Sequence, residues 1–322
     1  MSKIKTILIG TSGFAENIFR KTCSELKSRG FEIIGVITAP DKPVGRKQVL
    51  MPCPVKKWAL EGNFEVLEPD RIRKPKWVAK IKGLAPDLIV LCAYGQIIPK
   101  EILDIPKYKA LNIHPSLLPC WRGASPIQSA ILNGDKETGV SIMVMDEEMD
   151  HGPLLASTKL QIPNSQTYRE LENKLADLGA ELLIKTLPDW VEGKIKAKPQ
   201  EHSKATFCKL IKKEDGKIDW HKSAEEIERQ IRAFSEWPES YTDFNGKILK
   251  IIEADLEIPS DASSIPLGKT KGEVFLTNSR NLAVRTGKGI LILKEIQLAG
   301  KKPMSAKDFL NGHPEIIGMI FK

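Results

Sequence analysis

The first forty residues constrain the fold of this chain more than any other segment. An apolar run at residues 4–9 precedes a stretch of helical composition at 15–29, and a second apolar run follows at 32–38. A strand, a helix and a strand in this order imply a parallel sheet with helices on both faces. We therefore predict an α/β fold that starts near residue 4.

The following segments continue the alternation. Residues 55–62 and 72–84 have helical composition, and residues 87–93 form a continuous apolar run that is typical of a strand buried on both faces. A longer helix is predicted at 167–192. We expect its core-facing stripe to consist of Leu171, Leu175, Leu178 and Leu182. Together these elements predict a Rossmann-like, mostly parallel sheet in an N-terminal domain at residues 1–192.

A glycine-containing turn, Gly10-Thr-Ser-Gly13, follows the first predicted strand. It lacks the G-x-G-x-x-G spacing of a dinucleotide-binding loop. We interpret it as a tight turn that forms one wall of a site rather than as a cradle for a nucleotide.

The chain changes character after the long helix. Residues 193–205 show no apolar periodicity and carry four lysines against one glutamate, which predicts a basic linker or arm. A helix is expected at 224–234. Short alternating segments then follow at 241–244, 248–254, 272–276, 282–286 and 289–298. Several short strands separated by turns favour a small β-barrel, so we predict a second domain at residues 206–322.

Composition argues against a membrane protein, a secreted protein with disulfides and a metal-binding protein. The 322 residues contain 41% hydrophobic and 28% charged residues, with no apolar run long enough for a membrane span. The N-terminus enters a strand without an apolar leader, so we expect a cytoplasmic protein. Five cysteines, an odd number without Cys-x-x-Cys spacing, predict free thiols and no metal site.

Two segments concentrate the polar chemistry. The first runs from Asn112 to Gly123, and the second is the 145–153 loop. Side chains alternate along a strand, so Asn112 and His114 should share one face, and Pro115 should end the strand. Residues 124–133 are expected to form a helix. Residues 140–145 and 153–162 read as paired strands, which places Asp150 in the hairpin loop between them.

These side chains form a candidate catalytic set. Asn112 supplies a hydrogen-bond donor, His114 a titratable ring and Asp150 a carboxylate. This equipment suits the transfer of an acyl group to an amine, which needs a stabilised oxyanion and a positioned acid or base.

The same segments resemble the formyltransferases that use 10-formyltetrahydrofolate. Residues 112–119 and 122–127 are similar to the family signature, and Asp150 before Gly152 matches the carboxylate of a second motif. The pattern is most similar to that of the methionyl-tRNA formyltransferases. Further matches span almost the whole chain, at residues 10–15, 40–46, 51–56, 93–99, 232–238 and 299–304.

The resemblance implies a fold, a reaction and partners. It implies an OB-like barrel in the second domain and transfer of a formyl group to the amino group of methionine on initiator methionyl-tRNA, for translation initiation. Asn112 would donate to the oxyanion. His114 would stabilise the oxyanion or protonate the leaving nitrogen, and Asp150 would orient or charge His114. The expected protein is a bacterial-type monomer that needs no metal.

The resemblance also implies where the folate donor binds. We expect it between the 145–152 loop and two further segments. These are Tyr94, Gly95, Gln96, Ile97, Ile98 and Pro99, and Ser116, Leu117, Leu118 and Pro119.

Charge is compatible with a tRNA partner. The formal net charge is +8, with a sequence pI near 9.1. In the methionyl-tRNA formyltransferases a loop that corresponds to residues 41–51 reaches toward the acceptor end of the tRNA. The predicted tRNA contacts are Lys42, Arg46 and Lys47 in this loop, together with Lys209, Lys301 and Lys302.

The chain departs from the family pattern at three places, and three alternatives remain open. In the first glycine loop, Ser12-Gly13 stands where proline followed by a polar residue is frequent. Cys120 stands where a basic residue is common, and His151 stands where a small residue is usual, which predicts a second titratable ring near Asp150. The alternatives are a formyltransferase for a nucleotide or an amino sugar, a 10-formyltetrahydrofolate hydrolase, and a non-catalytic RNA-binding protein.

Overall fold

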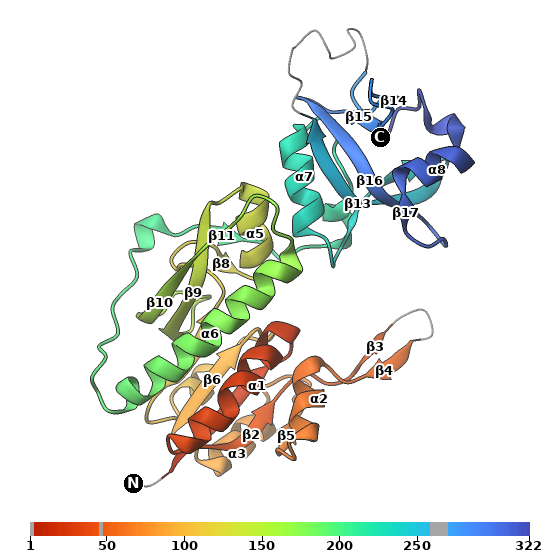
Figure 1. Ribbon diagram of the computed structural model, residues 1–322. Helices are drawn as coiled ribbons and strands as arrows, with labels where there is room; N and C mark the ends of the chain where they lie inside the picture. The colour runs from red at the N-terminus through yellow and green to blue at the C-terminus, as the bar shows by residue number, and fades with distance from the viewer. Residues whose placement is uncertain (1–2, 45–47, 258–269) are drawn as a thin grey trace. The chain divides into compact units, whose positions relative to one another are not determined.

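The structure is a computed structural model that describes residues 3–44, 48–257 and 270–322 (Figure 1). Arg46 and Lys47, two of the predicted tRNA contacts, lie outside the described residues. The chain divides into two compact units. The first comprises Met1–Pro126, Glu137–Gln161 and Leu171–Cys208, and the second comprises Ile127–Lys136, Ile162–Glu170 and Lys209–Lys322.

The first unit is built on a seven-stranded sheet of order β10-β9-β7-β6-β1-β2-β5. Five neighbouring strands, from β5 to β7, run parallel, whereas β9 and β10 are antiparallel additions at one edge. The mostly parallel sheet confirms the predicted fold class. The strands are β1 (Ile4–Gly10), β2 (Phe31–Ile37), β5 (Val66–Leu67), β6 (Leu88–Cys92), β7 (Ala110–His114), β9 (Glu137–Val144) and β10 (Leu154–Gln161).

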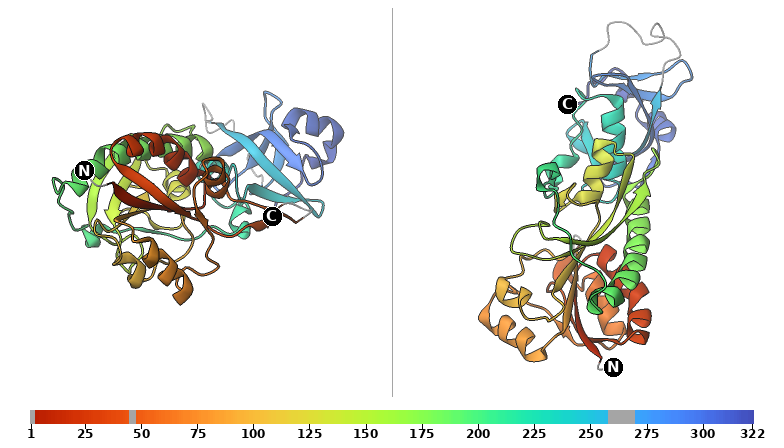
Figure 2. Two further views of the ribbon diagram at one scale, coloured as in Figure 1. Left: turned by 90° about the horizontal axis from the view of Figure 1, so that it is seen from below. Right: turned by 90° about the vertical axis from the view of Figure 1, so that its left-hand side faces the viewer.

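Helices cover both faces of this sheet (Figure 2). On one face, Ile81 of α3 and Ile102 of α4 pack in one buried cluster with Ile7, Ile9 and Ile89. On the other face lie α1 and α6. The helices up to residue 191 are α1 (Gly13–Ser28), α2 (Pro54–Glu61), α3 (Pro75–Leu84), α4 (Lys100–Leu103), α5 (Pro126–Asn133) and α6 (Tyr168–Val191).

A helical glycine allows α6 to approach α1 and the sheet closely. A Cβ atom added at Gly179 would lie 3.1 Å from Ile18 Cδ1 of α1 and 3.5 Å from Ile113 Cγ2 of β7. A larger side chain at this position would therefore hold the two helices apart.

Two predictions about helices need correction. The predicted helix at 72–84 begins only at Pro75, because the fixed φ angle and missing N–H of proline suit the first helical position. On α6, Leu178 and Leu182 are only half-buried, whereas Leu183 and Leu187 are buried with Leu171 and Leu175. The core-facing stripe follows the i, i+4 row that passes through Gly179, because that row faces α1 and the sheet.

The second unit contains a curled antiparallel sheet of order β12-β13-β16-β15-β14, with β17 paired to β16. Its apolar face covers a core that includes Ile227 of α7, Leu249, Leu291 and Phe309 of α8. This barrel-like sheet confirms the predicted class of the second unit. Its elements are α7 (Ala224–Ala233), β12 (Ser240–Phe244), β13 (Lys247–Glu257), β14 (Val274–Leu276), β15 (Leu282–Arg285), β16 (Ile290–Leu298), β17 (Met304–Ser305) and α8 (Ala306–Gly312).

Two small pairs of strands complete the described structure. The hairpin of β3 (Lys42–Val44) and β4 (Val49–Met51) lies within the predicted tRNA-facing loop. Next to the site described below, β8 (Arg122–Gly123) and β11 (Phe207–Cys208) pair in parallel. Single 3-10 turns occur at His202–Lys204, Lys213–Gly216 and Pro314–Ile316. Across the described ranges, none of the helices combines the length and the apolar character that a bilayer span requires.

The packing at Gly179 gives the first prediction. Gly179→Leu should lower the free energy of unfolding by roughly 1–3 kcal/mol or more, because the added side chain overpacks the contact between α6 and α1. Gly83→Leu in α3 is the matched control, because a Cβ at Gly83 meets no atom within 4 Å. Urea denaturation of both variants measures the difference. Equal stability of the two variants would contradict the proposed close packing.

Candidate active site

Strand β7 presents Asn112 and His114 on one face of the sheet. Asn112 pairs in register with Leu91 of β6. The Leu91 side chain belongs to the buried cluster on the face that α3 and α4 cover, so Asn112 and His114 also lie on this face. The strand ends at His114, as predicted. Both side chains are buried, with 6% and 4% of their surface exposed. Loops therefore cover this face and shield the Asn112 amide and the His114 ring from bulk water.

Asp150 reaches this face from the loop between β9 and β10. Val144 N donates to Pro153 O at 2.9 Å and closes the base of the loop. Asp150 has a φ of +50°, a left-handed conformation that aspartate tolerates better than most residues. A Cβ atom at Gly152 would overlap the Val144 carbonyl oxygen, so only glycine fits there. The local backbone thus turns the Asp150 side chain toward β7.

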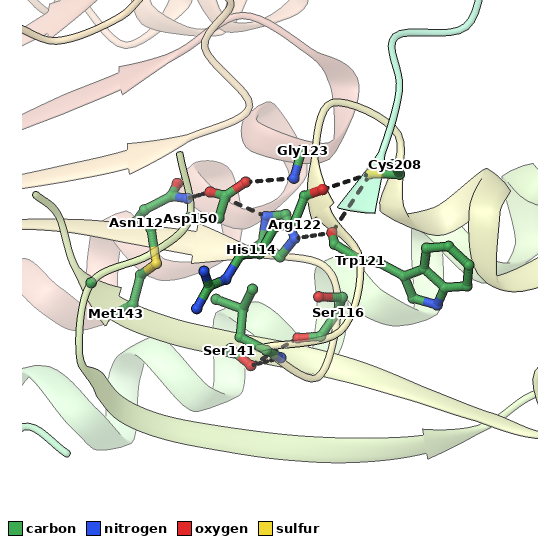
Figure 3. A network of polar contacts seen from close by, with 12 residues as sticks. Asn112, His114, Ser116, Trp121, Arg122, Gly123, Ser141, Met143, Asp150 and Cys208 are labelled. Atoms are coloured by element: carbon green, nitrogen blue, oxygen red, sulfur yellow. Dashed lines mark hydrogen bonds and ion pairs between the residues drawn. The ribbon is translucent and has the colours of Figure 1, made fainter. Parts of the chain in front are cut away.

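The carboxylate of Asp150 is the centre of the site (Figure 3). Its Oδ1 accepts a hydrogen bond from Asn112 Nδ2 at 3.2 Å, and its Oδ2 accepts one from Gly123 N at 2.8 Å. His114 Nδ1 lies 3.6 Å from Oδ1. The Asp150 side chain is only 12% exposed, so these contacts replace most of its hydration.

The second ring nitrogen of His114 fixes its tautomer. Nε2 lies 2.9 Å from the Trp121 carbonyl oxygen, which can only accept a hydrogen bond. Nε2 therefore carries a hydrogen and donates a hydrogen bond to this carbonyl. The atom that faces Asp150, Nδ1, is then the one that can gain or lose a proton.

The loop after β7 is held by bonds within the protein. Ser141 Oγ of β9 donates to Ser116 O at 2.8 Å and accepts from Leu118 N at 3.1 Å. Ser116 Oγ donates to Cys120 O at 2.6 Å. These bonds occupy the hydroxyl groups of Ser116 and Ser141, and Leu117 and Pro119 in the same loop are half-buried.

Two further buried residues, Arg122 and Gln200, belong to the site. Gln200 Nε2 donates to Asp150 O at 2.9 Å and to Gly152 O at 2.7 Å. Gln200 Oε1 accepts from Arg122 Nη2 at 2.7 Å. Gln200 lies in the segment predicted as a basic linker, and no spacing or motif there indicated a site. The signal for Arg122 was its place in the family-like motif, which gave it no role.

The predicted second ring near Asp150 belongs to a stacked pair. His151 Nδ1 lies 2.7 Å from Asp146 Oδ2, and the His151 ring stacks on His202 with centroids 4.1 Å apart. Arg122 Nη2 donates to His202 Nδ1 at 2.9 Å. The stacked pair therefore connects the Asp150 loop to Arg122. Cys120 is exposed.

The predicted donor loop, residues 94–99, contains both structural and exposed groups. Gln96 holds the loop to residues 69–72. Its Oε1 accepts a hydrogen bond from Ile72 N at 2.8 Å, and its Nε2 donates one to Pro69 O at 3.0 Å. Ile98 is buried, whereas Ile97 is 78% exposed. The Tyr94 hydroxyl is buried without a hydrogen-bond partner in the described part of the chain, and burial raises its pKa, so it stays protonated.

The described predicted tRNA contacts differ in their surroundings. Lys42 is exposed on β3, and Lys301 and Lys302 are exposed in the loop between β16 and β17. Lys209 is exposed but pairs with Asp215 at 2.5 Å. At the base of the β3–β4 hairpin, the ammonium of Lys56 bridges Asp41 at 2.7 Å and Glu68 at 2.8 Å.

Comparison with known proteins adds to this geometry. Residues 2–187 match the family model described as formyl transferase, and residues 210–314 match the formyl transferase C-terminal domain. A methionyl-tRNA formyltransferase from Sulfurihydrogenibium sp. (strain YO3AOP1) is 41% identical over 312 residues, which cover 96% of this chain and 97% of that protein. The methionyl-tRNA formyltransferase of Bacillus subtilis (strain 168) is 40% identical over 96% of this chain and 94% of its own length.

The chain belongs to the methionyl-tRNA formyltransferase family. It is a formyl-transferring enzyme, and the amide, imidazole and carboxylate described above are the polar groups that converge on the face of its first unit. In the described residues no three His, Cys, Asp or Glu side chains cluster closely enough to hold a metal ion.

Solved structures show the same fold. WlaRD, a sugar 3N-formyl transferase, has a TM-score of 0.64 and 23% identity, covering 94% of this chain and all of its own. HypX from Aquifex aeolicus, in complex with tetrahydrofolic acid, has a TM-score of 0.63 and 17% identity over 98% of this chain. This chain spans 48% of the HypX chain. At these identities the likeness concerns the fold.

The ion pairs of Lys56 give a prediction for alkaline pH. Hydrogen bonds to Asp41, and next to Glu68, raise the pKa of Lys56, so the folded state holds this proton more tightly than the unfolded chain does. The resulting stabilisation is complete below about pH 10, the range of an ordinary lysine, and is lost as pH rises through the raised pKa. The stability advantage of wild type over Lys56→Met should therefore shrink at strongly alkaline pH.

Urea denaturation at neutral and at strongly alkaline pH measures this advantage. Lys80→Met is the control, because Lys80 pairs with Glu65 at 3.4 Å with both side chains about half exposed, where ion pairs contribute little. An advantage of wild type over Lys56→Met that stays constant with pH would contradict the role of Lys56.

Proposed function

We propose that this protein transfers the formyl group of 10-formyltetrahydrofolate to the α-amino group of methionine on initiator methionyl-tRNA. The donor supplies a formyl carbon bound to N10. A bond forms from the amine nitrogen to this carbon, the carbon–N10 bond breaks, and one proton passes from the amine to the leaving nitrogen. The observation that carries the proposal is the convergence of Asn112, His114 and Asp150 in a chain that matches the family over nearly its whole length.

In this proposal Asn112 contacts the reacting atoms. One N–H of its Nδ2 is committed to Asp150, which leaves the second N–H to donate to the formyl oxygen as negative charge develops there. Its Oδ1 is buried and lacks a hydrogen-bond partner in the described structure, so it can accept an N–H from a bound substrate. Asp150 thus fixes the side-chain amide that would stabilise the transition state.

His114 and Asp150 act together on the proton. Because Nε2 donates to the Trp121 carbonyl, the mobile proton of His114 belongs on Nδ1, next to Asp150 Oδ1. The carboxylate stabilises the charged ring when the amine proton arrives there. Of the two roles that the sequence left open for His114, this arrangement supports proton transfer to the leaving nitrogen.

The residues near the site suit a flat heterocyclic donor. Such ligands need apolar walls and a few polar groups that fix their orientation. Ile97 and Met149 offer exposed apolar surface, at 78% and 66%, and Tyr94 and Asn112 each hold a buried polar atom without a partner in the described residues. Tyr94 and the nearby Met145 also pack against one buried cluster, which supports a donor site between the 94–99 and 145–152 loops.

The remaining predictions belong to the same proposal. Residues 1–192 would form the catalytic domain, residues 193–205 the linker and residues 206–322 a tRNA-binding domain. Lys42, Lys301 and Lys302 would contact phosphates, with Lys209 once it is released from Asp215. The protein would act as a monomer in the bacterial cytoplasm.

The direct test is a formylation assay with purified protein, 10-formyltetrahydrofolate and charged initiator tRNA. Formylmethionine should appear on the tRNA. Asn112→Ala should lower the rate by about 10²- to 10³-fold, the usual cost of one oxyanion donor. Asp150→Asn, which keeps the shape but removes the charge, should be at least as damaging. Asn133→Ala, at the exposed end of α5, is the control. Near-wild-type turnover in folded Asn112→Ala would refute this assignment.

The role of the second unit is tested separately. Replacing Lys301 and Lys302 together with alanine should raise the KM for methionyl-tRNA without changing folate binding. Each lost phosphate contact should also flatten the salt dependence of tRNA binding by close to one unit of slope. Lys159→Ala, an exposed lysine paired with Glu137 at 2.8 Å, is the control. An unchanged KM and salt slope in the double variant would mean that these lysines are only solvated.

A further inference from the structure

Gln200 makes an unusual set of contacts for a residue outside the catalytic motifs. Its side chain is 5% exposed, and both ends of its amide are used. Nε2 donates to the carbonyl oxygens of Asp150 and Gly152 at 2.9 and 2.7 Å, and Oε1 accepts from Nε and Nη2 of Arg122 at 3.2 and 2.7 Å. One side chain therefore joins the loop that carries the carboxylate to the loop that follows β7.

The Nε2 contacts hold the backbone at Asp150 and Gly152, where its conformation is unusual. Asp150 adopts a left-handed conformation, and Gly152 presses against the Val144 carbonyl. Both carbonyl groups point to the same amide nitrogen. Holding the carbonyl of Asp150 fixes its Cα, and hence the direction in which its carboxylate points toward Asn112 and His114.

The Oε1 contacts act on the other side of the same carboxylate. Arg122 is 4% exposed and immediately precedes Gly123, whose N–H donates to Asp150 Oδ2. It also immediately follows Trp121, whose carbonyl accepts from His114 Nε2. By holding Arg122, Gln200 fixes the main-chain groups that bind both Asp150 and His114.

The chain around Gln200 makes this position precise. Two residues earlier, Lys198 exchanges a pair of backbone hydrogen bonds with Leu154 at the start of β10, at 2.7 and 2.8 Å. Six residues later, Thr206 accepts from Trp121 N through its Oγ1 at 2.8 Å and from Arg122 N through its carbonyl at 2.9 Å. The segment that contains Gln200 is thus hydrogen-bonded at both of its ends to the elements that Gln200 joins.

We propose that Gln200 is a positioning residue for the formyl transfer, which acts by holding Asp150, and that Arg122 is its partner in this role. The inference rests on the proposed function, since it assigns a role in that reaction. It means that the segment after α6, which leads into the second unit, completes the active site of the first. A purely structural role for Gln200 would affect stability but not the rate of the folded enzyme.

Gln200→Glu separates the two roles. The substitution keeps the size of the side chain and its acceptor for Arg122, with an added opposite charge, but removes the donor to the Asp150 and Gly152 carbonyls. We expect kcat to fall on the order of 10²-fold, the scale for a small misplacement of a catalytic group, while the KM for tRNA and the binding of folate change little. Gln200→Ala should lower both kcat and the thermal midpoint.

Gln230→Glu is the matched control. Gln230 is also buried, at 4% exposure, and its Nε2 also lies near backbone carbonyls, those of Asp215, Gly216 and Lys217 at 3.3 to 3.5 Å, within the second unit. It should lose thermal stability yet keep the kcat of wild type. Wild-type enzyme in the same assay separates the two proposals, because an inactive wild type would reject the proposed function itself. Active wild type together with full kcat in folded Gln200→Glu would overturn the positioning role.

Discussion

The site depends on a single requirement, that the carboxylate of Asp150 be satisfied where little water reaches it. A buried carboxylate without hydrogen bonds is strongly unfavourable, so the folded protein must supply hydrogen-bond partners for the charged form. Here the partners come from two segments: Asn112 and His114 from β7, and the Gly123 N–H from the loop that follows. The same contacts fix the orientation of the Asn112 amide and keep the His114 ring beside the carboxylate, which is the geometry that the proposed reaction requires. The contacts that stabilise the charge therefore also set the geometry of the proposed reaction.

Close backbone approach makes these contacts attainable. A side chain at Gly152 would strike the Val144 carbonyl, and one at Gly123, which has a φ of +119°, would strike the carbonyl of Cys208. Glycine at these two positions lets the Asp150 loop fold over β7 and lets β11 pair with β8. The close approach of the main chain thus brings the Gly123 N–H and the side chains of β7 within reach of the carboxylate.

The segment after α6 links the site to the rest of the chain. Residues 198–208 bond to the start of β10, to the Asp150 loop and to the 119–123 loop, and then continue directly into Lys209 of the second unit. In the proposed function, in which the second unit binds tRNA, this segment connects the tRNA-binding unit covalently to the proposed catalytic groups. The buried pair of Arg122 and Gln200 gives this segment its hold on the site.

Much of this arrangement followed from local sequence. The alternation of apolar runs specified the parallel sheet, Pro115 marked the end of β7, and the period of two placed Asn112 and His114 on one face. The paired strands around residues 146–152 placed Asp150 on a hairpin loop. Periodicity and breakers determine these features, because each depends on neighbours within a few residues.

Tertiary structure alone decided which groups meet. Gln200 occupies a segment without pattern, yet it bonds residues 50 positions away, because its place is set by pairing with β10 and not by its neighbours in sequence. The stripe of α6 was displaced from Leu178 and Leu182 to Leu183 and Leu187 because Gly179 governs how α6 meets α1. The tautomer of His114 likewise depends on the carbonyl of Trp121, which only the folded loop supplies. The sequence determined the secondary-structure elements and the candidate catalytic residues, whereas long-range packing determined which residues these contact. A hydrogen bond between distant segments produces no periodic pattern in the sequence of either segment, so it could not be predicted from the sequence.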